Sequence, residues 1–188
     1  MSRLIGMLTA GLVSALALPA APGATILQNT GGDIGSIFAF VGESFTTPEG
    51  GPWSNITFNF YSDVPATTPA AAGTAFLLTQ EYLGTPNALG TGTAGFLAQS
   101  TGISGGQYVF DPSLILQPNT KYFLYENLAF TTSGGNTFAG GNAYFAFPAT
   151  DSFAPAPVPG GSGLQAANFL LSGTPVNTAV PEIGRAHV

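Results

Sequence analysis

Hydrophobic and polar residues alternate along several short stretches of this chain, most clearly over Trp53–Tyr61. Ile56, Phe58 and Phe60 fall on one side of this stretch, and the other side carries Asn55, Thr57, Asn59 and Tyr61. A period of two is typical of a half-buried antiparallel β-strand. We therefore predict a strand over Trp53–Tyr61 whose phenylalanine side faces a core.

Other segments of similar character recur between turns rich in Gly, Pro, Asn and Ser. No segment beyond the N-terminal region shows the periodicity of a helix. Many short strands at this spacing indicate an all-β fold, an antiparallel β-sandwich or jelly-roll-like single domain. The further predicted strands cover residues 25–29, 36–41, 43–47, 74–83, 96–100, 107–110, 121–130, 143–147 and 165–172.

The stretch Leu114–Tyr125 has the pattern of a corner between two sheets. An apolar triplet leads into Pro118 and Asn119, which both favour turns. Aromatic and aliphatic residues follow, beginning at Tyr122. A tyrosine in this position is typical of the tyrosine corner of Greek-key sandwiches, in which the hydroxyl bonds to the backbone upstream. We predict that role for Tyr122.

Charged residues make up only 6% of the 188 residues, and cysteine is absent. The high apolar and aromatic content excludes a disordered chain, and the length suits one domain. Residues 25–181 carry eight acidic side chains and one basic side chain, Lys121, and hence a net charge of −7. This acidity disfavours nucleic acid as a partner and favours solubility.

The N-terminus has the three parts of a secretory signal peptide. Arg3 provides the positive charge, Leu4–Leu18 is a mostly apolar run, and Pro19–Ala24 is rich in small residues. The apolar run is short for a membrane-spanning helix. We predict a signal-peptide helix over residues 1–24, removed on export, and a mature β-sandwich domain over residues 25–176.

Several segments together resemble the choice-of-anchor domains of bacterial surface proteins, in particular the type called R. The resemblance covers most of residues 25–172, and its motifs are structural rather than catalytic. It implies an exported protein that carries a C-terminal anchoring or sorting signal. The segments that carry the resemblance are Gly42–Pro48, Trp53–Tyr61, Gly73–Leu78, Glu81–Gly84 and Leu116–Tyr122.

Val180, Pro181 and Glu182 resemble the start of a PEP-CTERM sorting signal, so we assign residues 177–182 to it. The resemblance implies processing by an exosortase-type machinery and a location outside or on the surface of a Gram-negative-type bacterium. Ile183 stands where that signal has its second proline, and no apolar span or basic cluster follows. Residues 183–188 match the translation of a common sequencing adapter, so we interpret them as a non-native tail and the signal as truncated.

Most catalytic arrangements lack their residues in this chain. The only histidine, His187, lies in the suspect tail, which leaves the body without a Ser-His-Asp or Cys-His site or the preferred ligands of zinc. No cofactor is expected, although scattered oxygen ligands leave a structural calcium open. A pair of carboxylates can hydrolyse glycosides. The candidates for such a pair are Glu43, Glu81, Asp111 and Glu126.

Exposed aromatic rings beside amides would instead suit a neutral glycan. Trp53, Tyr61, Tyr82 and Tyr108 are the candidate platforms, and packing in the core is the alternative for each. We interpret the protein as an exported, non-enzymatic component of the bacterial surface or extracellular matrix. The alternative is a neutral-glycan-binding module of an exopolysaccharide matrix, and a weaker alternative is a glycosidase.

Overall fold

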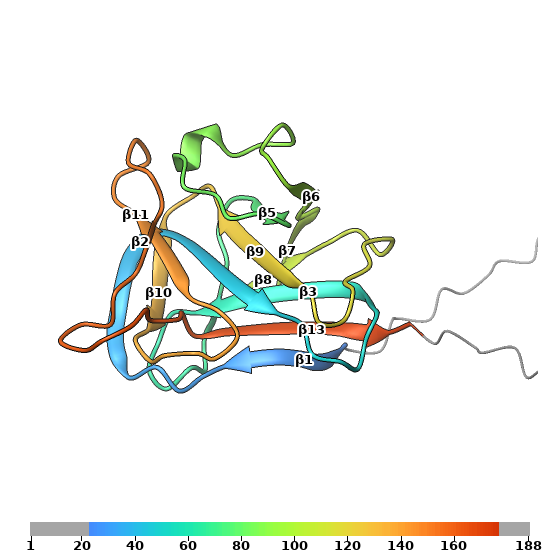
Figure 1. Cartoon of the computed structure of the whole chain (residues 1–188), viewed down its shortest axis with the longest axis horizontal. Coiled ribbons are helices and arrows are strands. Elements are labelled where there is room, and N and C mark those ends of the chain that lie inside the picture. Colours follow the sequence, from blue (N-terminus) through green and yellow to red (C-terminus); the bar gives the residue numbers. More distant parts are fainter. Residues whose placement is uncertain (1–22, 177–188) are drawn as a thin grey trace, which may run out of the picture.

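Two antiparallel β-sheets pack face to face in the computed structural model, which describes residues 23–176 (Figure 1). The described residues contain no α-helix and one short 3-10 turn, η1 at Pro86–Ala88. The predicted all-β sandwich is therefore confirmed. Residues 1–22 of the predicted signal-peptide helix, the sorting residues and the predicted tail lie outside the described residues. Ala24, the last residue assigned to that helix, is instead the first residue of a strand.

The first sheet has six strands and places the two ends of the described chain side by side. Its order is β1-β13-β3-β8-β7, and β4 pairs with β3 outside this path. These strands are β1 (Ala24–Asn29), β3 (Trp53–Tyr61), β4 (Pro69–Ala70), β7 (Gly102–Ser104), β8 (Gln107–Val109) and β13 (Phe169–Pro175).

The second sheet has seven strands in the order β12-β11-β2-β9-β5-β6, and β10 pairs with β2 outside this path. Its members are β2 (Ile34–Thr46), β5 (Ala75–Leu78), β6 (Phe96–Gln99), β9 (Lys121–Glu126), β10 (Phe130–Gly134), β11 (Ala143–Ala146) and β12 (Ala154–Pro155). The longest, β2, pairs with β10 through its first half and with β9 and β11 through its second half.

Strand β3 has the predicted bounds, but several other predicted bounds were wrong. The segments 36–41 and 43–47 form one strand, because Gly42 pairs with Tyr125 instead of breaking the ladder. The segment 74–83 stops pairing after Leu78, and 121–130 divides into β9 and β10. The closing strand starts at Phe169, and β7 was missed because Gly102–Ser104 carries almost no hydrophobic pattern.

The predicted corner is confirmed. Leu116 pairs with Trp53 of the six-stranded sheet, and five residues later the chain enters β9 of the seven-stranded sheet. The backbone N–H of Gln117 donates a hydrogen bond of 2.9 Å to the Tyr122 hydroxyl. Asn119 adopts a φ of 50°, a left-handed conformation that asparagine tolerates better than most residues. The corner thus joins the sheets and is tied by its tyrosine.

Aromatic side chains fill the space between the two sheets. Phe58 lies at the centre, with its ring centroid 5.3 Å from that of Phe169 and 5.0 Å from that of Phe60. Phe45 contributes from the facing sheet at 5.9 Å. Rings at these separations add attraction beyond the area they bury. The phenylalanine side of β3 therefore faces the core, as its alternation predicted.

A second cluster covers the outer face of the seven-stranded sheet. Tyr125, Tyr144 and Phe153 are buried there, together with Phe76, Leu78 and Leu89. Much of the cover comes from the long connection between β5 and β6, visible in green above the sheet in Figure 1. Both faces of β9 are consequently buried, which leaves the six-stranded sheet with the more open outer face.

Candidate functional site

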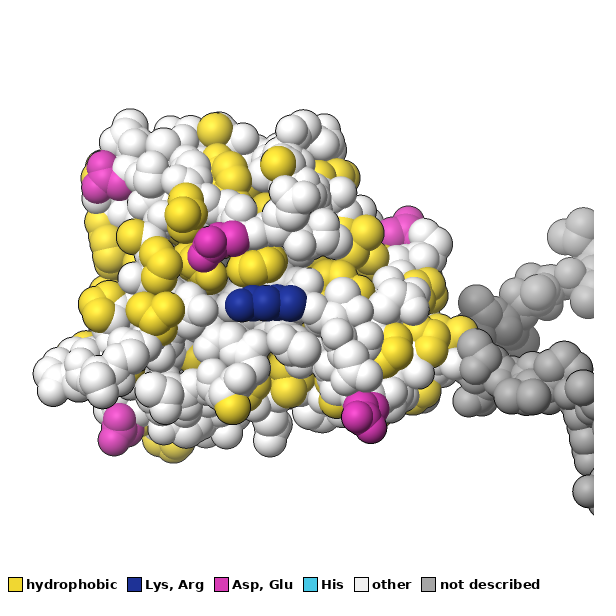
Figure 2. Space-filling view, viewed as in Figure 1, with side chains coloured by type: hydrophobic (Ala, Val, Ile, Leu, Met, Phe, Trp, Pro, Cys, Tyr) yellow, Lys and Arg dark blue, Asp and Glu magenta, His cyan; other side chains and the backbone are white. Residues whose placement is uncertain are grey.

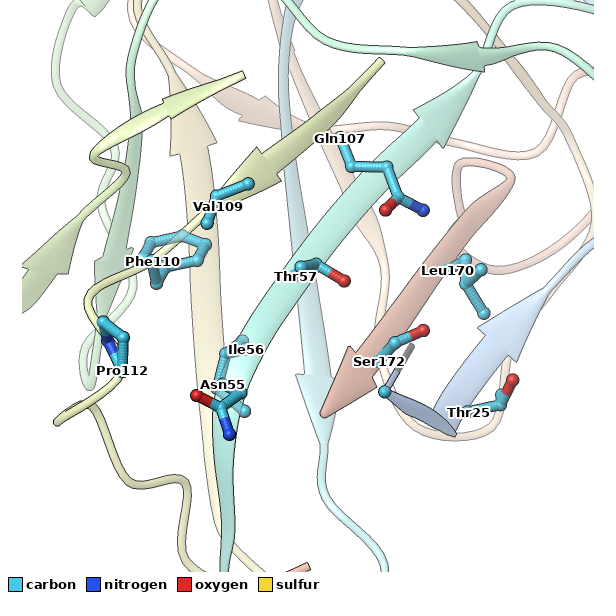
Figure 3. Close-up of a pocket in the computed structure, with 11 residues that line it drawn as sticks. Thr25, Asn55, Ile56, Thr57, Gln107, Val109, Phe110, Pro112, Leu170 and Ser172 are labelled. Carbon is cyan, nitrogen blue, oxygen red and sulfur yellow. The ribbon is translucent and has the colours of Figure 1, made fainter. Parts of the chain in front are cut away.

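A trough of about 480 Å³ lies on the outer face of the six-stranded sheet (Figure 3). It spans β1, β13, β3 and β8, which are neighbours in the sheet. Its polar lining side chains are hydroxyls and amides, and none of its lining residues carries a charge. The polar members are Thr25, Asn55, Thr57, Gln107 and Ser172, and we call this surface the polar trough.

The register of the sheet explains why these side chains gather. Thr57 of β3 pairs with Ser172 on one side and Val109 on the other, and Ser172 pairs with Thr25. Cross-strand partners point to the same face of a sheet. The register therefore sets three hydroxyl-bearing residues in a transverse row, seen across the middle of Figure 3.

Gln107 is held in place at the edge of the trough. Its Nε2 donates a hydrogen bond of 3.1 Å to Oδ1 of Asn59, the neighbouring residue on β3. In Figure 3 the Gln107 side chain reaches from β8 over β3. Because the Nε2 bond fixes the amide plane, the carbonyl oxygen of Gln107 becomes an oriented acceptor.

Asn55 marks an irregularity in the otherwise regular strand β3. Its φ is 51°, whereas L-residues in strands have negative φ. The pairing of β13 with β3 changes register between Ser172 and Thr174, and the pairing of β1 with β13 changes register between Thr25 and Leu27. Such bulges re-aim side chains. Here they lie where the exposed Asn55 amide joins the trough.

Among the aromatic candidates, Trp53 and Tyr108 cannot serve as platforms, because they are only 5% and 0% exposed. The Tyr108 hydroxyl donates to the backbone oxygen of Ala72 at 2.6 Å, which fixes the ring inside the core. For these two residues the core alternative holds. Tyr61 and Tyr82 are half-buried, and neither lines the polar trough. The Tyr82 hydroxyl donates to Thr85 within its own loop.

The carboxyl candidates divide into two buried and two exposed residues. Glu43 and Glu126 are fully buried. Glu81 and Asp111 are exposed and bonded to Tyr144 and Ser113. None of the four lines the polar trough.

Glu43 and Glu126 point into the space between the sheets. Glu43 pairs with Leu124, and Glu126 lies two residues beyond Leu124 on the same face. Diagonal neighbours of this kind are roughly 7–8 Å apart, a separation that two catalytic carboxyls could use. Their complete burial, however, leaves a substrate no route to them.

Backbone groups hold the two buried carboxyls. The Glu126 oxygens accept hydrogen bonds from Val41 N at 2.5 Å and Leu128 N at 2.7 Å. Glu43 Oε2 accepts one from Ala167 N at 2.8 Å, and its Oε1 has no partner among the described residues. Burial raises the pKa of Glu126 to about 8 and that of Glu43 well above its usual range. Burial thus favours the neutral form of both carboxyls, and their hydrogen bonds link neighbouring backbone segments.

Comparisons with known proteins found no relative whose site could be compared with this one. No family model, no curated protein and no solved structure matches the chain. The resemblance to choice-of-anchor domains and to a PEP-CTERM signal therefore stays a prediction, as does the place of Val180, Pro181 and Glu182 in such a signal. Those three residues lie outside the described residues.

Two further findings concern metals and membranes. Within residues 23–176, no three acidic, histidine or cysteine side chains gather as they would around a metal ion. The structural calcium that the sequence left open remains untested by this finding. No helix within the same residues is long and apolar enough to cross a membrane.

An apolar surface forms a second candidate site, which the sequence pattern did not reveal. Phe38 and Phe147 are 67% and 47% exposed, and they border a shallow hollow with Phe40, Ala129 and Pro148. Nothing in residues 23–176 covers it. Figure 2 shows how apolar side chains (yellow) share the visible face with scattered acids (magenta) and a basic side chain (dark blue). Lys121 is the only basic residue in the described part of the chain.

The sequence pattern indicated the contribution of strand β3 to the polar trough, but it did not indicate the contributions of the other strands. The alternation of β3 placed Asn55 and Thr57 on its polar side. Thr25, Gln107 and Ser172 join them only through pairing between strands distant in sequence. Small polar residues flanked by apolar ones were the available signal, and that signal does not say which strands are neighbours.

Proposed function

We propose that this protein is an exported, non-enzymatic component of the bacterial surface or extracellular matrix. Its sorting would use a PEP-CTERM and exosortase-type signal that is truncated in this chain. The pairing of β1 with β13 supports the proposal best, because it brings both ends of the described body together. Ala24 pairs with Gly173, and Gly23 and Val176 lie at the same end of the six-stranded sheet (Figure 1).

This arrangement suits a body that is processed at both ends. The predicted signal peptide precedes β1, and the predicted sorting segment follows β13. Removal of a leader before Thr25 would leave the pairing from Leu27 to Asn29 intact. Attachment through residues after Val176 would leave the opposite end of the sandwich accessible.

The placement of the carboxyls supports a role without catalysis. Glu43 and Glu126 accept hydrogen bonds from backbone N–H groups between the sheets. Glu81 and Asp111 form hydrogen bonds with neighbouring side chains at the surface. In the described residues, no pair of carboxyls faces an open cleft. A function through placement and binding agrees better with this arrangement than bond cleavage does.

Export is tested by fusing residues 1–24 to alkaline phosphatase, which needs disulfides formed outside the cytoplasm. We expect this fusion to show phosphatase activity in a Gram-negative host, and we expect no activity from the same phosphatase without residues 1–24. Equal activity, or inactivity of both proteins when both are present, would refute export.

The sorting signal is tested on the gene itself. We expect the natural reading frame beyond Pro181 to encode an apolar span followed by basic residues. In a host with an exosortase, Pro181→Ala with Glu182→Gln should then block processing, while Asn177→Ala with Thr178→Ala should not. A natural stop codon directly after Val188 would refute the truncated signal.

A further inference from the structure

We propose that the polar trough binds a neutral, hydroxyl-rich ligand, namely an oligosaccharide of uncharged sugars. This assignment does not rest on export, and it uses none of the aromatic residues that the sequence suggested as platforms. It rests on the shape of the trough, the chemistry of its lining and the conformation of Asn55.

The lining matches the hydrogen-bonding pattern of sugar hydroxyls. Thr25, Ser172 and Thr57 present hydroxyl-bearing side chains on successive strands, which lie about 4.8 Å apart. Each hydroxyl can donate and accept, as a sugar hydroxyl can. The repeat across the strands is comparable with the length of a sugar ring, so one chain lying across β1, β13 and β3 can meet each strand in turn.

Two amides complete the set of polar groups. Gln107 presents an oriented carbonyl oxygen, because its Nε2 is bonded to Asn59. Asn55 presents both a donor and an acceptor from an exposed position at the bulge. A positive φ inside a strand costs energy unless the surroundings impose it, and such positions concentrate at functional sites. The bulge aims the Asn55 amide at the trough.

The absence of charge from the lining sets the selectivity. A charged ligand would lose hydration in the trough without gaining an ionic partner. Leu170, Val109 and Pro112 provide apolar contacts between the polar groups and suit the C–H faces of sugar rings. No exposed aromatic ring lines the trough, so we expect each trough to bind weakly. Binding becomes effective when many copies of the protein bind one polymer.

The binding test is a titration of the full chain, labelled with ¹⁵N, followed by NMR. The neutral probes are cellopentaose, laminaripentaose and mannopentaose, and the anionic control is a galacturonic acid pentamer. At least one neutral probe should shift the backbone signals of residues 55–57, 107–109 and 170–172 and the side-chain amides of Asn55 and Gln107. No shift with any neutral probe, shifts confined to another face, or equal shifts with the anionic pentamer would overturn the proposal.

Matched substitutions then separate binding from folding. Thr57→Val and Gln107→Ala should each weaken binding about fivefold, the effect of one lost hydrogen bond. Thr131→Val and Gln99→Ala make the same changes at exposed positions of the other sheet and should leave binding unchanged.

Asn55→Gly provides an independent test, because glycine adopts a positive φ freely and keeps the bulge while removing the amide. We expect a well-folded variant with weaker binding. Wild-type affinity in all three trough variants, with native spectra, would overturn the proposal.

Discussion

The hydroxyl of Tyr122 accepts a hydrogen bond from the backbone N–H of Gln117, five residues earlier in the chain. This bond ties the corner at which the chain leaves the six-stranded sheet for the seven-stranded sheet. We expect Tyr122→Phe to lower the free energy of unfolding by about 1 kcal/mol, because the N–H loses its partner and the ring stays. Urea denaturation measures this change.

Tyr61→Phe is the matched control for the corner. The Tyr61 side chain is half-buried, and its hydroxyl makes no hydrogen bond to any residue in the range 23–176. Its stability should therefore equal that of the wild type. An equal loss in both variants would mean that the Tyr122 hydroxyl has no special role at the corner.

The buried carboxyls predict an unusual dependence of stability on pH. In the unfolded chain both glutamates ionise near pH 4.5, whereas in the folded protein Glu126 keeps its proton up to about pH 8. Between these values the folded state binds more protons, so stability falls as pH rises. Glu126 contributes a loss of roughly 1.4 kcal/mol per pH unit within this window, and the raised pKa of Glu43 acts in the same direction. Urea titrations at pH 5, 6, 7 and 8 would show this decline, and constant stability would contradict it.

The two buried glutamates should respond differently to an amide. Both oxygens of Glu126 accept hydrogen bonds from backbone N–H groups. Glu126→Gln replaces one of these oxygens with an NH₂ group, which cannot accept and so faces another donor. We expect a loss of about 1–3 kcal/mol, measured at pH 5. Glu43 has one oxygen without a partner, so Glu43→Gln can keep the bond from Ala167. It should cost little at pH 5 and reduce the decline toward pH 8.

Phe58 lies at the centre of the aromatic core between the sheets. Its ring touches those of Phe45, Phe60 and Phe169, and it is fully buried. Phe58→Ala should therefore cost about 3–5 kcal/mol in urea denaturation. The control, Phe147→Ala, removes an exposed ring and should stay within roughly 0.5 kcal/mol of the wild type.

Gly42 lies directly beneath the ring of Tyr125. A Cβ at position 42 would overlap Tyr125 Cδ1, and Tyr144 and Phe153 pack against that ring. We expect Gly42→Ala to lower thermal and urea stability by about 1–3 kcal/mol. Gly35→Ala, where a Cβ has open space on the same strand, should be neutral. Equal stability of the two variants would show that the Tyr125 ring can move aside.

The residue pattern by itself determined the all-β class, strand β3 and the tyrosine corner. These features depend on neighbours within a few residues, so alternation, turn residues and one tyrosine suffice to predict them. The residue pattern did not predict which strands distant in sequence pair with one another. Alternation along Lys121–Glu126 places Glu126 on the same face as Tyr122 and Leu124, but it does not show that this face is covered.

Tertiary structure decided the burial of Glu43 and Glu126, the second core over β9 and the composition of the polar trough. Each depends on which strands are neighbours and on what covers a face, and alternation is silent on both. The same physical reason separates Trp53 and Tyr108, sealed in the core, from Thr57 and Ser172, brought together across two strands. Local alternation assigns a side chain to one of two faces, and only the packing of the sheets decides which face meets solvent.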